Sequence, residues 1–390
     1  MKRRRFLAAG CAHCAALAPV TAFAQAGSSA WAAPQRFARP DLATDEGGLW
    51  ALMDREETRL RRSPFVMRDV ALQDYLRGIV CKLAGEHCPD FRAYAVRTPF
   101  FNASMAPNGM MQVWSGLLLR VENEAQLAAV IGHELGHYMQ RHTLDRLRDA
   151  KSRSAFATVM AAFGVVGLVG MLVAAAGALS FSRDQERDAD GIGLALMRAA
   201  GYDPREASKV WANLEAELTA APGAEANKRN PLFATHPPSE ERKQRLTQLA
   251  EADTGGFTGE AELAAVLAPF QQDLLDDELK RGQHAETLAL LDRLHQRTPQ
   301  RPDLLYFRGE TRRLRAEGDD LNLALADFDR AVALGREPAQ TWRSIGYVRQ
   351  KFAHTDAARA AFKRYLDNAP EAPDASLIRS YLDEPPPAKT

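Results

Sequence analysis

Two histidines and a glutamate stand at a spacing that suits metal-dependent hydrolysis. His133 and His137 are four residues apart, so on a helix their imidazoles face the same side and can reach one ion. Glu134, beside the first histidine, can lean toward a water at that ion without being a ligand. Zinc lowers the pKa of bound water, and a neighbouring carboxylate can act as base. The spacing therefore predicts one zinc ion per chain, with Glu134 as the catalytic base.

These histidines need a helix to present them, and the flanking residues predict one. Asn123 can cap its start, and Gln126 stands three residues later to complete a capping box. His142, five residues after His137, should point away from the ion, so we interpret it as polar surface. The alternative is an amphipathic helix with two polar-face histidines, but an apolar stripe along the predicted helix favours catalysis: Leu127, Val130, Ile131 and Leu135.

Further segments complete an ordered set of motifs. After His133–His137 come Ser182–Asp190, Thr235–Pro238 and Arg242. The set resembles the HtpX and CAAX-prenyl-endopeptidase group of zinc peptidases. Within that group it is most similar to the periplasmic beta-barrel assembly-enhancing proteases, which join this catalytic domain to tetratricopeptide repeats. The resemblance covers about residues 45–380 and implies a gluzincin-like zinc peptidase, misassembled outer-membrane proteins as substrates, and the barrel-assembly machinery as partner.

The resemblance also implies how two acidic residues take part in the site. Glu186 would be the third zinc ligand, and Asp190 would orient a ligand histidine from behind. The residues agree, because positions four apart share a helix face and metal-bound histidines usually donate their other N–H to a carboxylate or carbonyl. The alternatives are a solvated charge for Glu186, and for Asp190 a salt bridge with Arg187 or Arg183.

By the same resemblance, His236 and Arg242 approach the metal. His236 lies in a proline-framed loop and has two open roles. It could stabilise the oxyanion of the reaction as a preorganised donor, or occupy the fourth metal position and hold the enzyme inactive. Arg242 would support the site, or form a surface ion pair with Glu240 or Asp203.

The elements before the key helix include two helices and a small sheet. Helical spacing is found over residues 47–62 and 69–84, and strand-like patterns over 91–96 and 110–114. We therefore expect a mainly α fold with a small antiparallel sheet. Residues 102–114 resemble the family's cleft edge, where an extended substrate could add as a strand. A hairpin that merely packs is an equal alternative.

Residues 155–179 carry no charge, a pattern typical of a membrane span. If His137 before this segment and Glu186 after it bind one metal, both lie on one side of a membrane, so a single crossing is excluded. A soluble or membrane-surface helical hairpin is favoured over an inserted one. Peripheral membrane contact through 155–179 is therefore an expectation.

The chain beyond about residue 266 is wholly helical and repetitive. The 34-residue period is that of tetratricopeptide repeats, whose stacked helices form a concave surface for peptide or protein. We predict such repeats over 266–382, with an ordinary helical bundle as alternative. Trp342 and Gly346 also fit the motif, and three positions recur at the period: Ala324, Phe328 and Arg336 return as Ala358, Phe362 and Pro370.

The N-terminus reads as an export signal, of either the twin-arginine or the Sec type. A basic start and an apolar, alanine-rich stretch predict a signal peptide over 1–24, followed by a flexible lead-in over 25–45. The metallopeptidase domain is then expected over 46–258. The chain has 390 residues, with 50 lysines plus arginines against 50 acidic residues, which gives no case for nucleic-acid binding.

Removal of the export signal would leave two cysteines in the chain, Cys81 and Cys88. In an oxidising compartment this pair predicts a disulfide. The alternatives are two free thiols, or a cysteine and histidine metal site that uses His87.

The sequence therefore predicts a periplasmic zinc endopeptidase that acts on unfolded or misassembled envelope proteins. Its main rival is a tetratricopeptide chaperone or assembly factor whose peptidase site is mostly shut by His236. A structural zinc protein is a second rival, but it would need a closed metal shell, and no cysteine lies near these ligands in the sequence.

Overall fold

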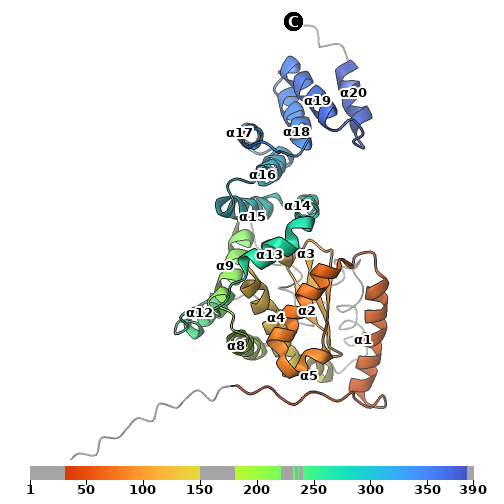
Figure 1. Ribbon diagram of the computed structural model, residues 1–390, viewed down its shortest axis with the longest axis vertical. Helices are drawn as coiled ribbons and strands as arrows, with labels where there is room; N and C mark the ends of the chain where they lie inside the picture. The colour runs from red at the N-terminus through yellow and green to blue at the C-terminus, as the bar shows by residue number, and fades with distance from the viewer. Residues whose placement is uncertain (1–30, 150–180, 221–231, 233–235, 237–239, 384–390) are drawn as a thin grey trace, which may run out of the picture. The chain divides into compact units, whose positions relative to one another are not determined.

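The computed structural model describes residues 31–149, 181–220, 232, 236 and 240–383 (Figure 1). The predicted signal peptide and the uncharged segment 155–179 lie outside the described residues. Residues 33–390 cluster as one compact unit, so the division into a peptidase and a repeat domain stays a prediction. Within the described residues, no helix combines the length and the apolar character that a bilayer crossing requires.

The described elements are mostly helices, with three strands near the start (Figure 1). As far as residue 249 they are α1 (Asp45–Arg62), α2 (Val70–Ala84), the 3-10 helix η1 (Gly85–Asp90), β1 (Arg92–Val96), β2 (Ala103–Met105), β3 (Met110–Trp114), α3 (Ser115–Arg120), α4 (Glu124–Met139), α5 (His142–Asp149), α8 (Arg183–Ala199), α9 (Glu206–Thr219) and α12 (Glu240–Leu249). Helices follow as α13 (Glu260–Leu267), the 3-10 helix η3 (Ala268–Phe270), α14 (Gln271–Lys280), α15 (His284–Arg297), α16 (Pro302–Arg315), α17 (Asp320–Leu334), α18 (Gln340–Lys351), α19 (Thr355–Asn368) and α20 (Ala375–Asp383).

The sheet is mixed, so the expectation of an antiparallel sheet is wrong for one of its two pairings. Strand β3 is central and pairs in parallel with β1, with Arg92 opposite Met110. It pairs antiparallel with β2, with Ala103 opposite Val113. The strand order is therefore β1-β3-β2: the second strand in the sequence lies at one edge, and the third lies between the other two. Strand β2 has only three residues, too few for an alternating pattern to reveal it.

Helix α1 is attached to this sheet by a buried carboxylate. Glu57 accepts hydrogen bonds from Arg92 at 2.7 Å through both of its oxygens, and from the Tyr94 hydroxyl at 2.7 Å. Asn108, in the turn between β2 and β3, donates to it at 3.1 Å. One acid thus joins α1, β1 and the turn that sets the β2–β3 pairing.

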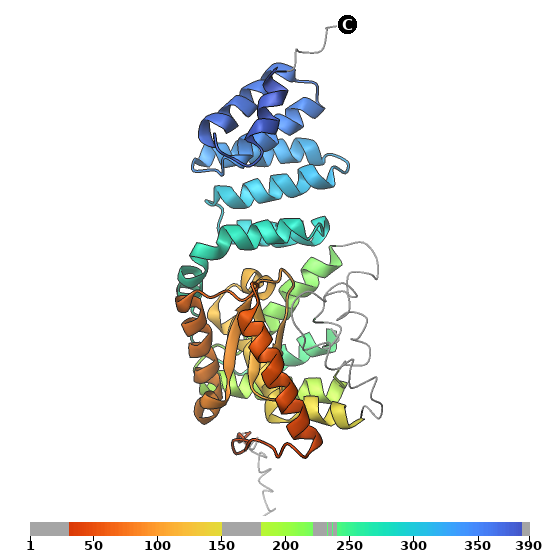
Figure 2. The same ribbon diagram turned by 90° about the vertical axis from the view of Figure 1, so that its right-hand side faces the viewer.

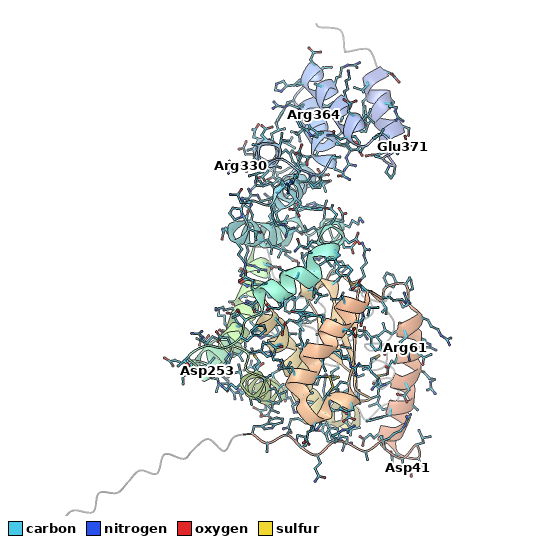
Figure 3. The ribbon with its side chains drawn as sticks, in the orientation of Figure 1. Asp41, Arg61, Asp253, Arg330, Arg364 and Glu371 are labelled. Atoms are coloured by element: carbon cyan, nitrogen blue, oxygen red, sulfur yellow. A yellow bond between two sulfur atoms is a disulfide. The ribbon has the colours of Figure 1, made fainter. Side chains whose placement is uncertain are left out.

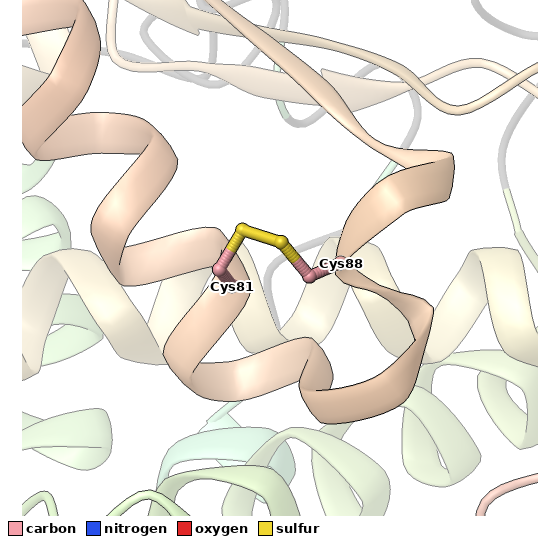
Figure 4. The surroundings of a disulfide bond; sticks show 2 residues. All are labelled: Cys81 and Cys88. Atoms are coloured by element: carbon pink, nitrogen blue, oxygen red, sulfur yellow. A yellow bond between two sulfur atoms is a disulfide. The ribbon is translucent and has the colours of Figure 1, made fainter.

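The predicted disulfide is confirmed and links α2 to η1 (Figure 4). Cys81 and Cys88 are bonded to each other, which rules out both free thiols and a metal site that uses these sulfurs. Part of the predicted flexible lead-in also packs on the fold. Arg36 donates to Asp90, and Phe37 lies against Tyr138 with ring centroids 5.4 Å apart.

Helices α16 to α19 form two pairs with the same internal contact. A Cβ on Gly309 would lie 2.5 Å from the Phe328 ring, and one on Gly346 would lie 2.3 Å from the Phe362 ring. In each pair a glycine therefore makes room for the phenylalanine of the next helix. The repeated contact supports a helical repeat, while its assignment to the tetratricopeptide class stays a prediction.

Helices α15 to α20 succeed one another along the C-terminal part of the chain, from teal to dark blue in Figure 2, and neighbouring helices are in contact. Their apolar residues face each other, whereas charged side chains such as Arg330, Arg364 and Glu371 are exposed (Figure 3).

Candidate metal centre

Helices α4 and α8 pack so closely that their backbones touch. A Cβ on Gly136 would lie 2.9 Å from Cα of Ala189, and one on Gly132 would lie 3.2 Å from the carbonyl oxygen of Gly193. Only glycine fits at such separations without a shift of the neighbouring helix. The contact brings the His133–His137 motif against the buried face of α8.

A side-chain cap fixes the start of α4, although the predicted capping box is only half formed. Asn123 accepts a hydrogen bond from the backbone N–H of Gln126 at 2.9 Å, as expected. The Gln126 side chain, however, accepts from the backbone N–H of Glu122 instead of Asn123. The cap still sets the helix start that orients the two histidines.

A complete capping box starts α8, because Ser182 and Gln185 each satisfy the other's backbone N–H. Glu186 and Asp190 follow on the same buried face, one turn apart. Of the neighbouring predicted motif, Thr235, Pro237 and Pro238 lie outside the described residues.

Four side chains converge at this helix pair: His133, His137, Glu186 and His236. Their potential ligand atoms all lie within 4.8 Å of one another. The Nε2 atoms of His133 and His137 are 3.1 Å apart, and Nε2 of His137 lies 3.4 Å from Oε1 of Glu186. Donors bound tetrahedrally to zinc at the usual lengths are separated by about 3.3 Å. The spacing and the nitrogen and oxygen donor set therefore fit a zinc ion among them.

His236 stands at the fourth corner of this arrangement. Its Nδ1 lies 3.2 Å from Nε2 of His133 and 2.8 Å from Oε1 of Glu186. A catalytic zinc site needs one position left open for water. Both roles expected for His236 place its imidazole beside the metal, as the structure does.

Glu134 lies beside the four donors without being one of them. Its carboxylate is buried, with Oε1 3.5 Å from Nε2 of His236. This oxygen has no hydrogen-bond partner among the residues that the structure describes. An ionisable oxygen free of such bonds next to the cluster is what a catalytic base requires.

His133 is held from behind by a buried ion pair. Oδ1 of Asp190 lies 2.9 Å from Nδ1 of His133, and Arg242 binds both Asp190 oxygens at 2.7 and 2.8 Å. Arg242 also reaches Oε2 of Glu186 at 2.9 Å. The structure thus places Asp190 and Arg242 behind the donors, and both side chains are buried. Arg242 also lies 2.9 Å from Nδ1 of His133. An arginine can only donate, so the acceptor for a proton on this nitrogen is Asp190.

Sequence reasoning missed Trp211 on α9. The Arg242 guanidinium lies 4.1 Å from the Trp211 ring centroid, in cation–π geometry, and the His133 ring lies 6.3 Å from it. The sequence contains no signal for this contact.

The expectation that His142 is polar surface is wrong, because the ring is buried with its Nδ1 3.0 Å from Nδ1 of His137. The helix does not continue past Met139. Arg141 has a φ of 56°, which turns the chain back. Phe181, also missed, stacks on His137 with ring centroids 3.9 Å apart.

Burial and neighbouring charges of opposite sign shift the pKa values of the acids in this site in opposite directions. Burial raises the pKa of Glu134 to about 7. Burial would also raise the pKa of Glu186, but the His236 charge and hydrogen bonds from His137 and His236 outweigh it and hold that pKa far below its usual range. Burial lowers the pKa of His133 and of His137, which favours the neutral imidazoles that bind metal.

Comparison with known proteins agrees with this geometry. Residues 67–250 match the model of peptidase family M48. The mitochondrial metalloendopeptidase OMA1 of Arabidopsis thaliana is 35% identical over 153 residues, which are 39% of this chain and 30% of that protein. The beta-barrel assembly-enhancing protease of Escherichia coli is 28% identical over 194 residues, 43% of this chain and 38% of that protein.

A putative beta-barrel assembly-enhancing protease of Vibrio cholerae is also similar. It is 28% identical over 199 residues, 47% of this chain and 40% of that protein. The chain thus spans less than half the length of each of these relatives.

Proposed function

Because residues 67–250 form a metallopeptidase domain of family M48, we propose that this chain is a zinc-dependent endopeptidase. The convergence of His133, His137 and Glu186 on one point, with Glu134 beside them, carries the proposal. A zinc ion held by these three residues would lower the pKa of water and polarise the scissile carbonyl.

Other residues of the chain would transfer the proton and position the ligands. Glu134 takes a proton from the attacking water and returns it to the leaving amine. Asp190 and Arg242 hold His133 in place, so that its Nε2 faces the centre of the site.

His236 must leave the fourth position before water can enter. On this proposal, the described conformation would be a self-inhibited state of the peptidase. Once displaced, the same imidazole would lie close enough to the site to donate to the oxyanion, which is the other role expected for it.

The substrate would be an extended, unfolded segment. Strand β2 is one of the two edge strands of the sheet, and it contacts α4, the helix that carries Glu134. A peptide added along this edge would place its main chain beside the base. A folded protein cannot offer such a strand, which favours unfolded or misassembled proteins as clients.

For the cellular role we propose the periplasm, with clients among envelope proteins and contact with the barrel-assembly machinery through the C-terminal helices. The predicted export signal and the Cys81–Cys88 disulfide support an oxidising compartment. The names of two relatives point to beta-barrel assembly. Membrane contact through 155–179 belongs to the same proposal, but that segment lies outside the described residues.

The second candidate is a chaperone or assembly factor whose peptidase site is mostly shut. The position of His236 at the fourth corner favours it. The two candidates differ in whether the cellular role needs hydrolysis. The chaperone predicts that Glu134→Gln complements a deletion strain as well as the wild type does, whereas the peptidase predicts no complementation.

Casein digestion by the mature chain tests the peptidase directly. We expect activity that a chelator abolishes, that zinc restores, and that Glu134→Gln lacks. His236→Ala should be more active than the wild type if His236 inhibits, and His354→Ala, an exposed histidine outside the site, should match the wild type. Activity that survives chelation would overturn the zinc mechanism.

A further inference from the structure

We propose that His142 is a positioning residue for His137: its Nδ1 accepts a hydrogen bond from Nδ1–H of His137 and so holds the imidazole with Nε2 toward the metal. This inference rests on the zinc site of the proposed function. It concerns the ligand's orientation, and His142 itself does not touch the metal.

The two nitrogens of His137 face different neighbours. Nε2 lies 3.1 Å from Nε2 of His133 and 3.4 Å from Glu186, inside the donor cluster. Nδ1 lies 3.0 Å from Nδ1 of His142. A neutral histidine that binds metal through Nε2 carries its proton on Nδ1, and that proton needs an acceptor. The acceptor in reach is His142, with its own proton on Nε2.

The backbone is bent to bring His142 to this place. On a continued helix, a residue five positions after His137 would point away from it. Helix α4 ends at Met139, Arg141 takes a φ of 56°, and α5 starts at His142. A left-handed conformation is unfavourable for arginine and persists only where the surrounding structure compensates. Here the reversal returns the next side chain to the rear of a metal ligand.

Packing holds the two rings in this geometry. The His142 ring is 5% exposed and meets the His137 ring edge-on, at 71° and 5.1 Å between centroids. Phe181 stacks on His137 at 3.9 Å. His137 is therefore covered by a ring on one face and hydrogen-bonded at its rear.

The two ligand histidines of α4 thus have different supports. His133 has the carboxylate of Asp190 behind it, whereas His137 has an imidazole. A neutral acceptor orients the ligand without adding a negative charge next to Glu186. Partners of this kind usually change metal affinity about 10- to 100-fold when removed.

Two variants separate the hydrogen bond from the packing. His142→Phe keeps a ring of similar shape but removes the acceptor. His142→Asn loses the ring but keeps an acceptor, because its Oδ1 is bonded to Cγ just as Nδ1 is in histidine. His87→Phe serves as control, since His87 is also buried but lies in η1.

The measurement is the zinc dissociation constant, by competition with a chromophoric chelator, and the absorption spectrum of the cobalt-substituted protein. We expect His142→Phe to bind zinc about 10- to 100-fold more weakly. His142→Asn and His87→Phe should stay close to the wild type. Equal affinity in His142→Phe and the wild type, or equal losses in both His142 variants, would overturn the inference. Failure of the wild type to bind zinc would instead overturn the proposed function.

Discussion

At the residue level, the support of His133 depends on charges that are taken out of water. Burial opposes ionisation of Asp190, but the Arg242 charge and the hydrogen bond from His133 outweigh it and lower the pKa of Asp190. The same guanidinium is covered by the Trp211 ring. Asp190 is thus a fixed anion on α8, held by Arg242 of α12, which is in turn covered by Trp211 of α9.

Replacing Asp190 by alanine should therefore weaken metal binding without touching a ligand. We expect Asp190→Ala to raise the zinc dissociation constant about 10- to 100-fold, because His133 loses the acceptor that fixes its tautomer. Chelator competition measures this constant. Asp188→Ala, an exposed acid on the same helix, is the matched control. Unchanged affinity in Asp190→Ala would show that Arg242 and packing alone orient His133.

Spacing alone predicts the two histidines of α4. The family resemblance implies four further residues of the site: Glu186, Asp190, His236 and Arg242. His133 and His137, or Glu186 and Asp190, lie one helical turn apart, and that can be read from the chain. His142 could not be placed, because its position depends on the left-handed turn at Arg141.

Trp211 and Phe181 show the same limit in another way. Both meet the site only through packing of segments that are distant in sequence. No periodic pattern in the sequence encodes such a contact, so only the structure identifies the Trp211 and Phe181 rings as parts of the site.

At the level of elements, α1 is attached to the sheet through an acid that stays ionised although it is buried. Burial alone would raise the pKa of Glu57, but hydrogen bonds from Arg92 and Tyr94, together with the Arg92 charge, outweigh it and lower that pKa. Stability linked to a lowered carboxyl pKa is complete above the unfolded-state pKa. It is lost as the pH falls through the folded-state value.

Glu57→Gln should therefore destabilise the protein at neutral pH but not in acid. At pH 7 we expect a loss of about 1.5–3 kcal/mol, the range for hydrogen bonds to a charged group. Wild type and variant should begin to converge below about pH 4.3, the ordinary value for glutamate, and should coincide only below the lower folded-state pKa of Glu57. Urea unfolding of the chelated protein at several pH values measures this without a contribution from metal loss.

Two outcomes separate this linkage from other effects. Glu86→Gln, an exposed acid in η1, should match the wild type at every pH. A difference between Glu57→Gln and the wild type that stays constant with pH would contradict the linkage.

The elements also show which parts of the fold the sequence encodes locally. Apolar periodicity predicts α1 and α2 to within about two residues, the usual uncertainty of helix ends, and the Asn123 cap predicts the start of α4 but not its end at Met139. The order of strands is not local, because β2 gains its place only by pairing with β3. The periodicity of the sequence therefore could not predict that the sheet is mixed.

At the level of the molecule, a buried ion cluster joins helices that are far apart in the chain. Arg120 of α3 donates to Glu217 of α9 at 2.7 Å and to Glu278 of α14 at 2.9 Å. Arg293 of α15 binds the other Glu217 oxygen at 2.7 Å. Helix α9 also carries Trp211, which covers Arg242. One helix therefore contacts both the metal centre and the start of the C-terminal helices.

Removing Arg120 should be costly, because Glu217 then keeps only Arg293, and Glu278 only Arg281, as arginine partners among the described residues. Burial lowers the pKa of Arg120, but Glu278 and Glu217 outweigh it and raise that pKa, so the guanidinium stays charged. Breaking a buried pair from one side costs about 3–5 kcal/mol. The figure for a charge left wholly unpaired is therefore an upper limit here. We expect a loss of at most this size in Arg120→Ala by urea unfolding.

A matched surface arginine shows whether burial is the cause. Arg187 also binds two acids, Asp184 and Glu241, but its side chain is 42% exposed. Exposed pairs contribute about 0–1 kcal/mol, so Arg187→Ala should change stability little. Comparable losses in Arg120→Ala and Arg187→Ala would mean that water reaches the cluster. The link through α9 would then be no stronger than a surface contact, and the C-terminal helices could separate from the metal centre at little cost.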